Sequence, residues 1–209
     1  MRMVGRGLAG IAGQLGNPHG WAGSVVAAVL NRGNRYLIEA AVDAAQVRRG
    51  QTVADIGFGG GAGLGLLLER AGANGTVHGI EISRDMLSRA GYRYGRFLEA
   101  GRLRLEPGSL TELPLATASV DAAITVNTVY FLAELERACA ELRRVLRPGG
   151  RVVVGVGEPE AMARMPFTRY GIRLRPVAEV IGALERAGLV VEHGVIERWP
   201  IDGHFLVGR

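Results

Sequence analysis

The sequence predicts a single α/β domain whose sheet is doubly wound and mostly parallel. Length is the first observation, because 209 residues with a hydrophobic fraction of 48% suffice for one domain with a sizeable core. The second is that short runs rich in β-branched residues alternate with longer segments of helical period, the order expected of βαβ units. The third is a glycine-rich segment at residues 57–63, directly after the first such run, where these folds turn from strand to helix.

Seven strands are expected. Five are clear, at Thr52–Ile56, Thr76–Glu81, Arg102–Glu106, Ala122–Val126 and Arg151–Val156. Two weaker ones lie near Val190–Ile196 and His204–Val207. Between them, apolar residues at helical spacing predict one helix over Leu135–Leu146 and another over Val177–Leu184.

Two further helices are predicted before the first strand, over Ala22–Leu30 and Arg35–Val47. The turn-forming residues Asn31–Asn34 separate them. We expect residues 1–50 to form an N-terminal helical cap and residues 51–209 to form the main domain, the two parts making one structural unit.

The chain is basic, with a formal net charge of +5 and a pI near 10.1. All 25 basic residues are arginine, and 32 residues are glycine, a combination that indicates codon bias in a GC-rich genome. We therefore expect no specific nucleic-acid partner.

A cytoplasmic location is expected from the single Cys139, which falls in a helical pattern and suits a buried, reduced thiol. The N-terminal apolar stretch is interrupted by polar residues at Gln14, Asn17 and His19, which disfavours a secretory signal. The longest apolar run nearby, Val25–Leu30, is far shorter than the roughly 20 residues that a transmembrane helix needs.

The glycine-rich turn predicts a ligand site. Gly57, Gly59 and Gly61 allow positive φ and a close approach of the backbone to a flat ligand, although this spacing also fits a dinucleotide site. Asp55, at the tip of the preceding strand, suits a cationic ammonium better than a pyrophosphate. Glu81 ends the next strand, where a carboxylate accepts hydrogen bonds from ribose hydroxyls, a feature that both kinds of cofactor require.

Two later segments resemble the class I methyltransferase family. They read Asp-Ala-Ala-Ile-Thr-Val-Asn-Thr-Val-Tyr-Phe-Leu from Asp121 and Glu-Leu-Arg-Arg-Val-Leu-Arg-Pro-Gly-Gly-Arg-Val-Val-Val from Glu141. The resemblance is to the branch with ubiquinone, menaquinone and other small-molecule methyltransferases, and it covers residues 51–156 most clearly. It implies a Rossmann-like, seven-stranded sheet with the last strand antiparallel, S-adenosylmethionine as cofactor, and no metal.

The resemblance also implies which residues contact the cofactor. The methionine part would be held by Asp55, Gly57, Gly59, Gly61 and the backbone carbonyl of Asn127. The nucleoside would be held by Glu81 at the ribose, Ile82 on one adenine face, and the segment with Ser109 and Leu110. Many relatives carry an aspartate where this chain has Ser109, whose hydroxyl still accepts a hydrogen bond.

Methyl transfer from a sulfonium is an in-line displacement, so the protein mainly aligns the reactants and, where needed, removes a proton. Tyr130 would lie near the transferring methyl, and His19 stands out in a turn-rich loop with a tryptophan, so both are catalytic candidates. Tyr36, Tyr170 and His193 are further candidates, with His193 expected on a solvated edge strand.

The acceptor is expected to be a small molecule or lipid. The segment Asn127–Tyr130 lacks the prolines of amino-methylating DNA enzymes, and a lone Cys139 disfavours arsenic methylation. An adaptable apolar pocket would come from the cap and from Met162, Met165, Phe167 and Tyr170. Two alternatives stay open, a nucleic-acid or protein methyltransferase and a non-catalytic S-adenosylmethionine-binding protein. The sequence also leaves a homodimer open.

Overall fold

A computed structural model describes residues 34–165, 168, 172–198 and 201–209. These residues build one seven-stranded sheet in the order β3-β2-β1-β4-β5-β7-β6. The strands are β1 (Thr52–Ile56), β2 (Thr76–Glu81), β3 (Leu103–Pro107), β4 (Val120–Val126), β5 (Leu146–Gly157), β6 (Val191–Ile196) and β7 (Gly203–Gly208). All neighbours pair in parallel except β7, which is antiparallel to both β5 and β6.

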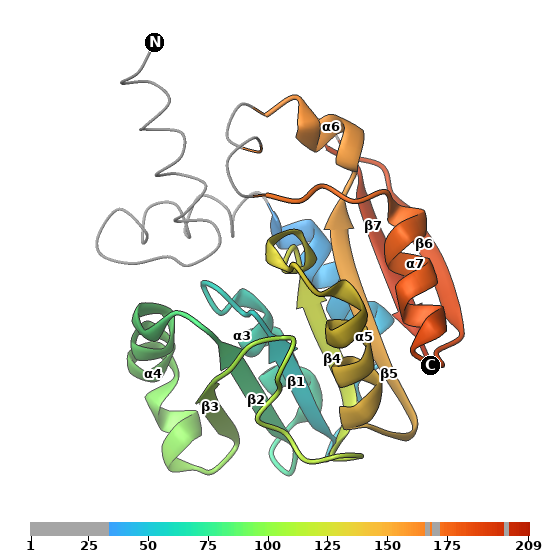
Figure 1. Ribbon diagram of the computed structural model, residues 1–209. Coiled ribbons are helices and arrows are strands. Elements are labelled where there is room, and N and C mark those ends of the chain that lie inside the picture. The colour runs from blue at the N-terminus through green and yellow to red at the C-terminus, as the bar shows by residue number, and fades with distance from the viewer. Residues whose placement is uncertain (1–33, 166–167, 169–171, 199–200) are drawn as a thin grey trace.

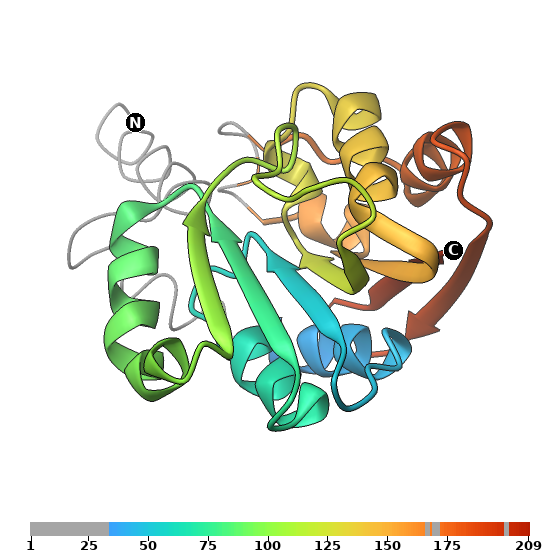
Figure 2. The same ribbon diagram turned by 90° about the horizontal axis from the view of Figure 1, so that it is seen from below.

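Helices cover both faces of the sheet (Figures 1 and 2). One face carries α5 (Leu135–Val145) and α7 (Val177–Arg186). The other carries α3 (Ala62–Ala71), α4 (Arg84–Glu99) and a helix at residues 34–44. The turn η1 (Val129–Phe131) follows β4, and the short α6 (Pro159–Ala163) follows β5. The alternation of strand and helix thus produces the predicted α/β fold.

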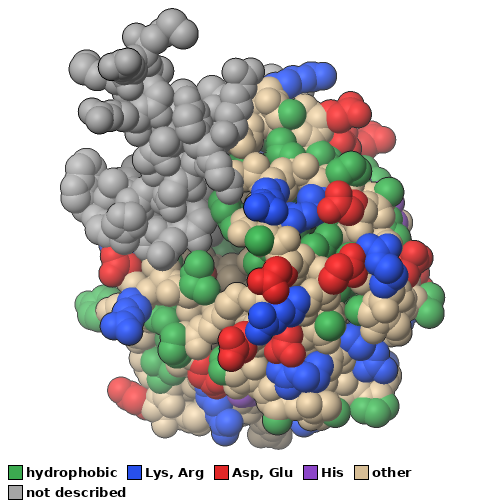
Figure 3. Space-filling view, in the orientation of Figure 1, with side chains coloured by type: hydrophobic (Ala, Val, Ile, Leu, Met, Phe, Trp, Pro, Cys, Tyr) green, Lys and Arg blue, Asp and Glu red, His purple; other side chains and the backbone are tan. Residues whose placement is uncertain are grey.

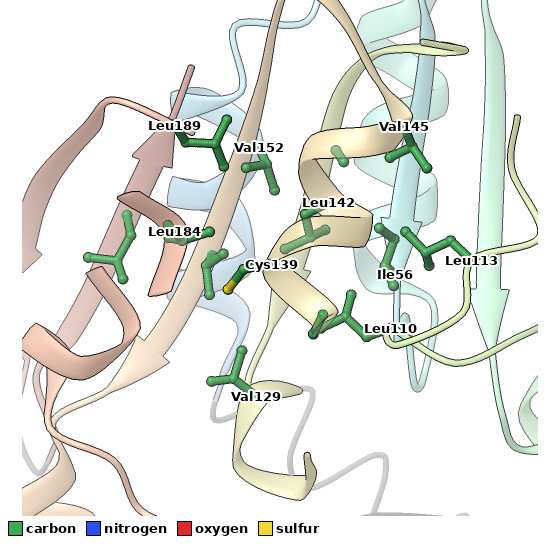
Figure 4. Close-up of a cluster of buried hydrophobic side chains, with 14 of the residues drawn as sticks. Ile56, Leu110, Leu113, Val129, Cys139, Leu142, Val145, Val152, Leu184 and Leu189 are labelled. Carbon is green, nitrogen blue, oxygen red and sulfur yellow. The ribbon is translucent and has the colours of Figure 1, made fainter. Parts of the chain in front are cut away.

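Each face has its own apolar core, because strand residues alternate between the two sides. Val152 and Val154 face α5 and α7, whereas Val153 between them faces the opposite helices. Figure 4 shows the first core, in which Cys139 lies close to Leu142 and Leu184. Cys139 is 2% exposed, which confirms the prediction of a buried thiol.

The predicted bounds of β1 and β2 match the structure, and those of β3 and β6 are shifted or shortened by one residue. The structure corrects β5, which begins at Leu146 instead of Arg151 because Leu146 pairs with Val120; the register then shifts, since residues 147–150 of β5 lie opposite Asp121 of β4.

The second of the two predicted N-terminal helices corresponds to residues 34–44. Its residues Ala41 and Val42 are fully buried against the sheet, in the same core as Val153 and Val207. This helix is therefore part of the layered domain. The first, Ala22–Leu30, lies outside the described residues.

An acidic residue fixes the end of the sheet at which β1 begins. One carboxylate oxygen of Asp121 accepts hydrogen bonds from the backbone N–H of Thr52 at 2.8 Å and from the Arg147 guanidinium at 2.7 Å. The contact joins β1, β4 and β5 at one point.

Among the helices that the structure describes, none is long and apolar enough to cross a membrane.

Candidate functional site

The turns that follow β1, β2, β3 and β4 meet at the carboxyl edge of the sheet. The backbone N–H of Gly57, after β1, donates to the carbonyl of Ile80 in β2 at 2.7 Å. Gly108, after β3, donates to the carbonyl of Glu81 at 3.2 Å. The Thr128 hydroxyl, after β4, lies 3.5 Å from the carbonyl of Ile56. In open α/β sheets this edge is where ligands bind.

The glycine-rich turn is left-handed at Gly57, Gly59 and Gly61, with φ of 69°, 52° and 76°. The three glycines have different surroundings. A Cβ at Gly57 would lie 2.7 Å from the Thr128 hydroxyl, and one at Gly61 would lie 3.3 Å from the Tyr94 ring. A Cβ at Gly59 would meet no atom within 4 Å. Gly59 therefore faces the open side of the turn, where a ligand has room.

Asp55 is a buried acid below this turn, with 5% of its surface exposed. In the described part of the chain no group donates a hydrogen bond to its carboxylate. Burial, and then the Glu81 charge, raise the pKa of Asp55 from 3.8 to about 8. A Cβ at Gly63 would overlap the Asp55 carboxylate, so this position in the first turn of α3 has room only for glycine. This acid lacks a cationic partner.

Glu81, at the end of β2, connects the turns after β1 and β2. Its Oε2 accepts from the N–H of Gly59 at 2.9 Å, and its Oε1 accepts from the N–H groups of Ile82 at 2.9 Å and Ser83 at 3.0 Å. A carboxylate has about four acceptor positions. One acceptor position on Oε2 therefore stays free for one ribose hydroxyl. For Glu81 to accept hydrogen bonds from both ribose hydroxyls, one of the three backbone donors has to move away.

The residues expected around adenine differ in exposure. Ile82 is 51% exposed beside Glu81, so its side chain is free to pack against a planar ring. The Ser109 hydroxyl lies 2.9 Å from that of Thr111 and accepts from the Thr111 N–H at 3.2 Å. Leu110 is 3% exposed in the core (Figure 4), so it anchors this segment instead of lining an open surface.

Asn127 follows β4 in the left-handed region, with φ of 57°, and its N–H donates to the carbonyl of Gly155 at 2.8 Å. Its side-chain oxygen is buried without a hydrogen-bond partner. Asp55 and Asn127 thus place two unsatisfied acceptor groups at the ends of the paired strands β1 and β4. Buried acceptors of this kind require donors, and an ammonium supplies several.

The tyrosines offered as catalytic candidates have structural contacts. The Tyr130 hydroxyl donates to the carbonyl of Gly157 at 3.0 Å, and burial raises the pKa of Tyr130 well above its usual value. The Tyr36 hydroxyl donates to the carbonyl of Ile201 at 3.0 Å. Both are therefore neutral donors, and this geometry favours a supporting role. His19 and Tyr170 lie outside the described residues.

His193 is exposed on the edge strand β6, as expected, but it is not isolated. Its Nε2 lies 2.9 Å from Nδ1 of His204, whose Nε2 lies 2.7 Å from the Glu158 carboxylate. Burial, and then His204, lower the pKa of His193. The chain of three side chains ends at Glu158, just after β5.

Sequence reasoning missed two residues that shape the turn, Thr128 and Tyr94. The Tyr94 hydroxyl donates to the carbonyl of Gly61 at 2.7 Å, across 33 residues of sequence. Helical spacing places Tyr94 on one face of α4 with Met86 and Ala90, which indicates burial but not its partner.

Comparison with known proteins decides the family. Residues 54–154 match the methyltransferase domain family, and this segment contains every cofactor-site residue described above. This segment is a class I S-adenosylmethionine-dependent methyltransferase domain. S-adenosylmethionine is the cofactor of this family, and it carries an ammonium group and a ribose, the two groups expected at Asp55 and Glu81 from the sequence.

Curated relatives share this segment. The chain is 38% identical over 119 residues to an uncharacterized 37.1 kDa protein in transposon TN4556 of Streptomyces fradiae, covering 57% of this chain and 33% of that protein. It is 33% identical over 105 residues to an arsenite methyltransferase of Halobacterium salinarum, covering 50% and 27%. The chain therefore spans about a third or less of the length of these two relatives.

Solved structures of methyltransferases share the fold. The chain superposes with a TM-score of 0.76 and 21% identity on a Haloferax volcanii complex of the Trm112 methyltransferase activator and a putative methyltransferase, covering 90% of this chain and 95% of that one. An S-adenosylmethionine-dependent methyltransferase from Aquifex aeolicus gives a TM-score of 0.70 at 23% identity, covering 87% and 96%. The fold of the described residues is thus shared with these two structures.

Among the described residues no group of His, Cys, Asp and Glu side chains has the arrangement of a metal site. The Glu81 carboxylate instead accepts three backbone N–H groups.

Proposed function

We propose that this methyltransferase transfers the methyl group of S-adenosylmethionine to a small-molecule or lipid acceptor in the cytoplasm. The observation that supports the proposal is the buried Asp55 carboxylate, which lies against Gly63 in the first turn of α3 and accepts no hydrogen bond from the residues that the structure describes. An ammonium group at this place would neutralise the acid and supply the missing hydrogen bonds.

The chain contributes positioning more than acid–base chemistry. Asp55 and Asn127 would fix the amino acid part of the cofactor, and Glu81 and Ile82 would fix the nucleoside. S-adenosylmethionine supplies an electrophilic methyl carbon. As the acceptor bonds to that carbon, the carbon–sulfur bond breaks with its electron pair on sulfur, and the proton of an O–H or N–H acceptor leaves to a base or to water. Alignment of this kind supplies much of the acceleration of a displacement.

Several relatives favour a small acceptor. An O-methyltransferase of Aspergillus sclerotiorum is 30% identical over 122 residues, and one of Penicillium expansum is 32% identical over 107 residues. A relative with arsenite as its named substrate also matches, but the lone Cys139 of this chain is buried. Burial, and then the Glu136 charge, raise the pKa of Cys139 to about 12, so its thiol is a poor arsenic ligand.

Charges on the visible surface argue against nucleic acid as the acceptor. Figure 3 shows basic and acidic side chains interspersed on the face that carries α5 and α7. Arg144 and Arg186 pair with glutamates on this face, and Arg147 pairs with Asp121. Arginines engaged in this way leave no continuous basic track for a phosphate backbone.

Ligand binding provides the test. S-adenosylmethionine and S-adenosylhomocysteine should both raise the melting temperature, and NAD should not, because only the first two carry an amino acid ammonium. Mass spectrometry of a small-molecule extract incubated with the protein and isotope-labelled cofactor should then reveal the methylated acceptor. A shift with NAD and none with S-adenosylhomocysteine would contradict the proposal. Methylation confined to RNA, DNA or protein would replace the proposed acceptor class.

A further inference from the structure

Tyr94 lies on α4, but its side chain reaches the glycine-rich turn on α3. Its hydroxyl donates to the carbonyl of Gly61 at 2.7 Å, and its surface is only 7% exposed. Gly61 is the N-cap residue of α3, and its carbonyl also accepts the N–H of Gly65 at 3.4 Å. The hydroxyl of Tyr94 thus holds the residue at which the turn becomes a helix.

Two glycines make room for this ring. A Cβ at Gly61 would lie 3.3 Å from the Tyr94 ring, and one at Gly65 would lie 3.0 Å from the Tyr94 hydroxyl oxygen. The glycines of this segment therefore divide into two groups. Gly61 and Gly65 accommodate Tyr94, whereas a Cβ at Gly59 would enter open space. The spacing of glycines in the sequence reflects an internal contact as well as a ligand.

The backbone of α4 is distorted where the contact is made. Tyr94 has non-helical φ and ψ of −111° and 18°, with Gly91 and Gly95 close by in the same helix. Glycines lower the cost of such a kink. The helix begins at Ser83, whose N–H donates to Glu81. The N-terminal end of α4 is thus hydrogen-bonded to Glu81, the acid expected at the ribose. Tyr94, at the kink of the helix, is hydrogen-bonded to Gly61 in the glycine-rich turn.

We propose that Tyr94 is a positioning residue that holds the glycine-rich turn in its cofactor-binding conformation before the cofactor arrives. The inference rests on the proposed use of S-adenosylmethionine. A turn fixed in advance does not lose conformational entropy on binding, so the brace increases affinity without a contact to the cofactor. Electrostatics agree with the placement, because burial raises the pKa of Tyr94 against the opposing Arg93 charge, Asp55 adds a smaller rise, and the net upward shift keeps the hydroxyl a donor.

The test compares Tyr94→Phe with Tyr92→Phe, a matched control on the same helix whose side chain is 95% exposed. Removing one buried hydroxyl bond should weaken S-adenosylhomocysteine binding, measured by calorimetry, by about five- to tenfold. In the cofactor-free protein, amides of residues 57–65 should exchange hydrogen faster in Tyr94→Phe than in the unmodified protein. Tyr92→Phe should change neither quantity.

A second variant separates positioning from stability. Gly65→Ala keeps the tyrosine but pushes its hydroxyl aside, and alanine favours a helix more than glycine does. We expect the melting temperature to hold or rise while S-adenosylhomocysteine binding weakens about threefold, part of one hydrogen bond. Unchanged affinity in both variants, or unchanged exchange at residues 57–65 in Tyr94→Phe, would overturn the inference. If the unmodified protein binds no S-adenosylhomocysteine, the proposed function fails instead, and the exchange experiment still decides on Tyr94.

Discussion

The substitution Asp55→Asn replaces the buried acid by an amide of nearly the same shape. With the pKa of Asp55 at about 8, the carboxyl group is about nine-tenths protonated in the free protein at about pH 7. An ammonium ligand favours the carboxylate, so cofactor binding should release close to one proton. Affinity should then rise by nearly tenfold between about pH 6 and pH 7 and level off above about pH 8.

The same shift has a consequence for folding. The folded state keeps its proton up to about pH 8, whereas the unfolded carboxyl loses it near its usual value of 3.8. The stabilisation by the protonated acid is therefore complete below 3.8 and decreases as the pH rises to about 8. Asp55→Asn lacks this dependence, so the cofactor-free variant should be more stable than the unmodified protein at about pH 8, by about 1 kcal/mol or more.

Calorimetry in two buffers of different ionisation enthalpy measures the released protons, and urea denaturation measures stability. We expect Asp55→Asn to release none and to bind S-adenosylhomocysteine about ten- to a hundredfold more weakly, the loss of one charge-assisted hydrogen bond of about 1.5–3 kcal/mol. Proton release near zero in the unmodified protein, with an affinity independent of pH, would refute the reasoning.

Three further predictions concern other parts of the molecule. Gly59→Val should abolish S-adenosylhomocysteine binding in a titration, because the side chain enters the open side of the turn, whereas Gly50→Val, equally left-handed at φ 86° but before β1, should bind normally. Cys139, with a pKa of about 12, should react with iodoacetamide only after denaturation, and labelling in the native protein would contradict its burial. Arg175→Met should lower the free energy of unfolding by about 2–4 kcal/mol, because the carbonyls of Val129 and Leu132 lose their donor, whereas the exposed Arg186→Met should leave the urea midpoint unchanged.

Local patterns in the sequence were sufficient for much of the sheet. The bounds of β1 and β2 follow from compact runs of β-branched residues that end in an acid, and the structure confirms both. The start of β5 was not accessible in this way, because Pro148 and two glycines interrupt the run. Only the pairing of Leu146 with Val120, a tertiary contact, extends the strand across them.

The site could be predicted where its chemistry is local. The order of Asp55, the glycines and Glu81 along the chain places the acids at neighbouring strand ends, whatever the rest of the sequence does. The hydrogen bond from Tyr94 to Gly61 and the pKa of Asp55 depend instead on residues that come together only when the chain folds. The sequence of a helix does not indicate which group a tyrosine hydroxyl will contact. The sequence around an acid likewise does not indicate how far folding excludes water from it.

The contact of Asp121 with Thr52 and Arg147 stabilises the sheet at one end, whereas the loops proposed to bind ligands lie at the other end. It fastens three strands at the end of the sheet opposite the cofactor turns, so the strand order does not depend on the loops that meet the substrate. Loops at the carboxyl edge can then diverge in length and composition while the anchor stays in place. Such an arrangement lets one scaffold be adapted to new acceptors, and it marks the Asp121 end as the place to attach a label without disturbing the chemistry.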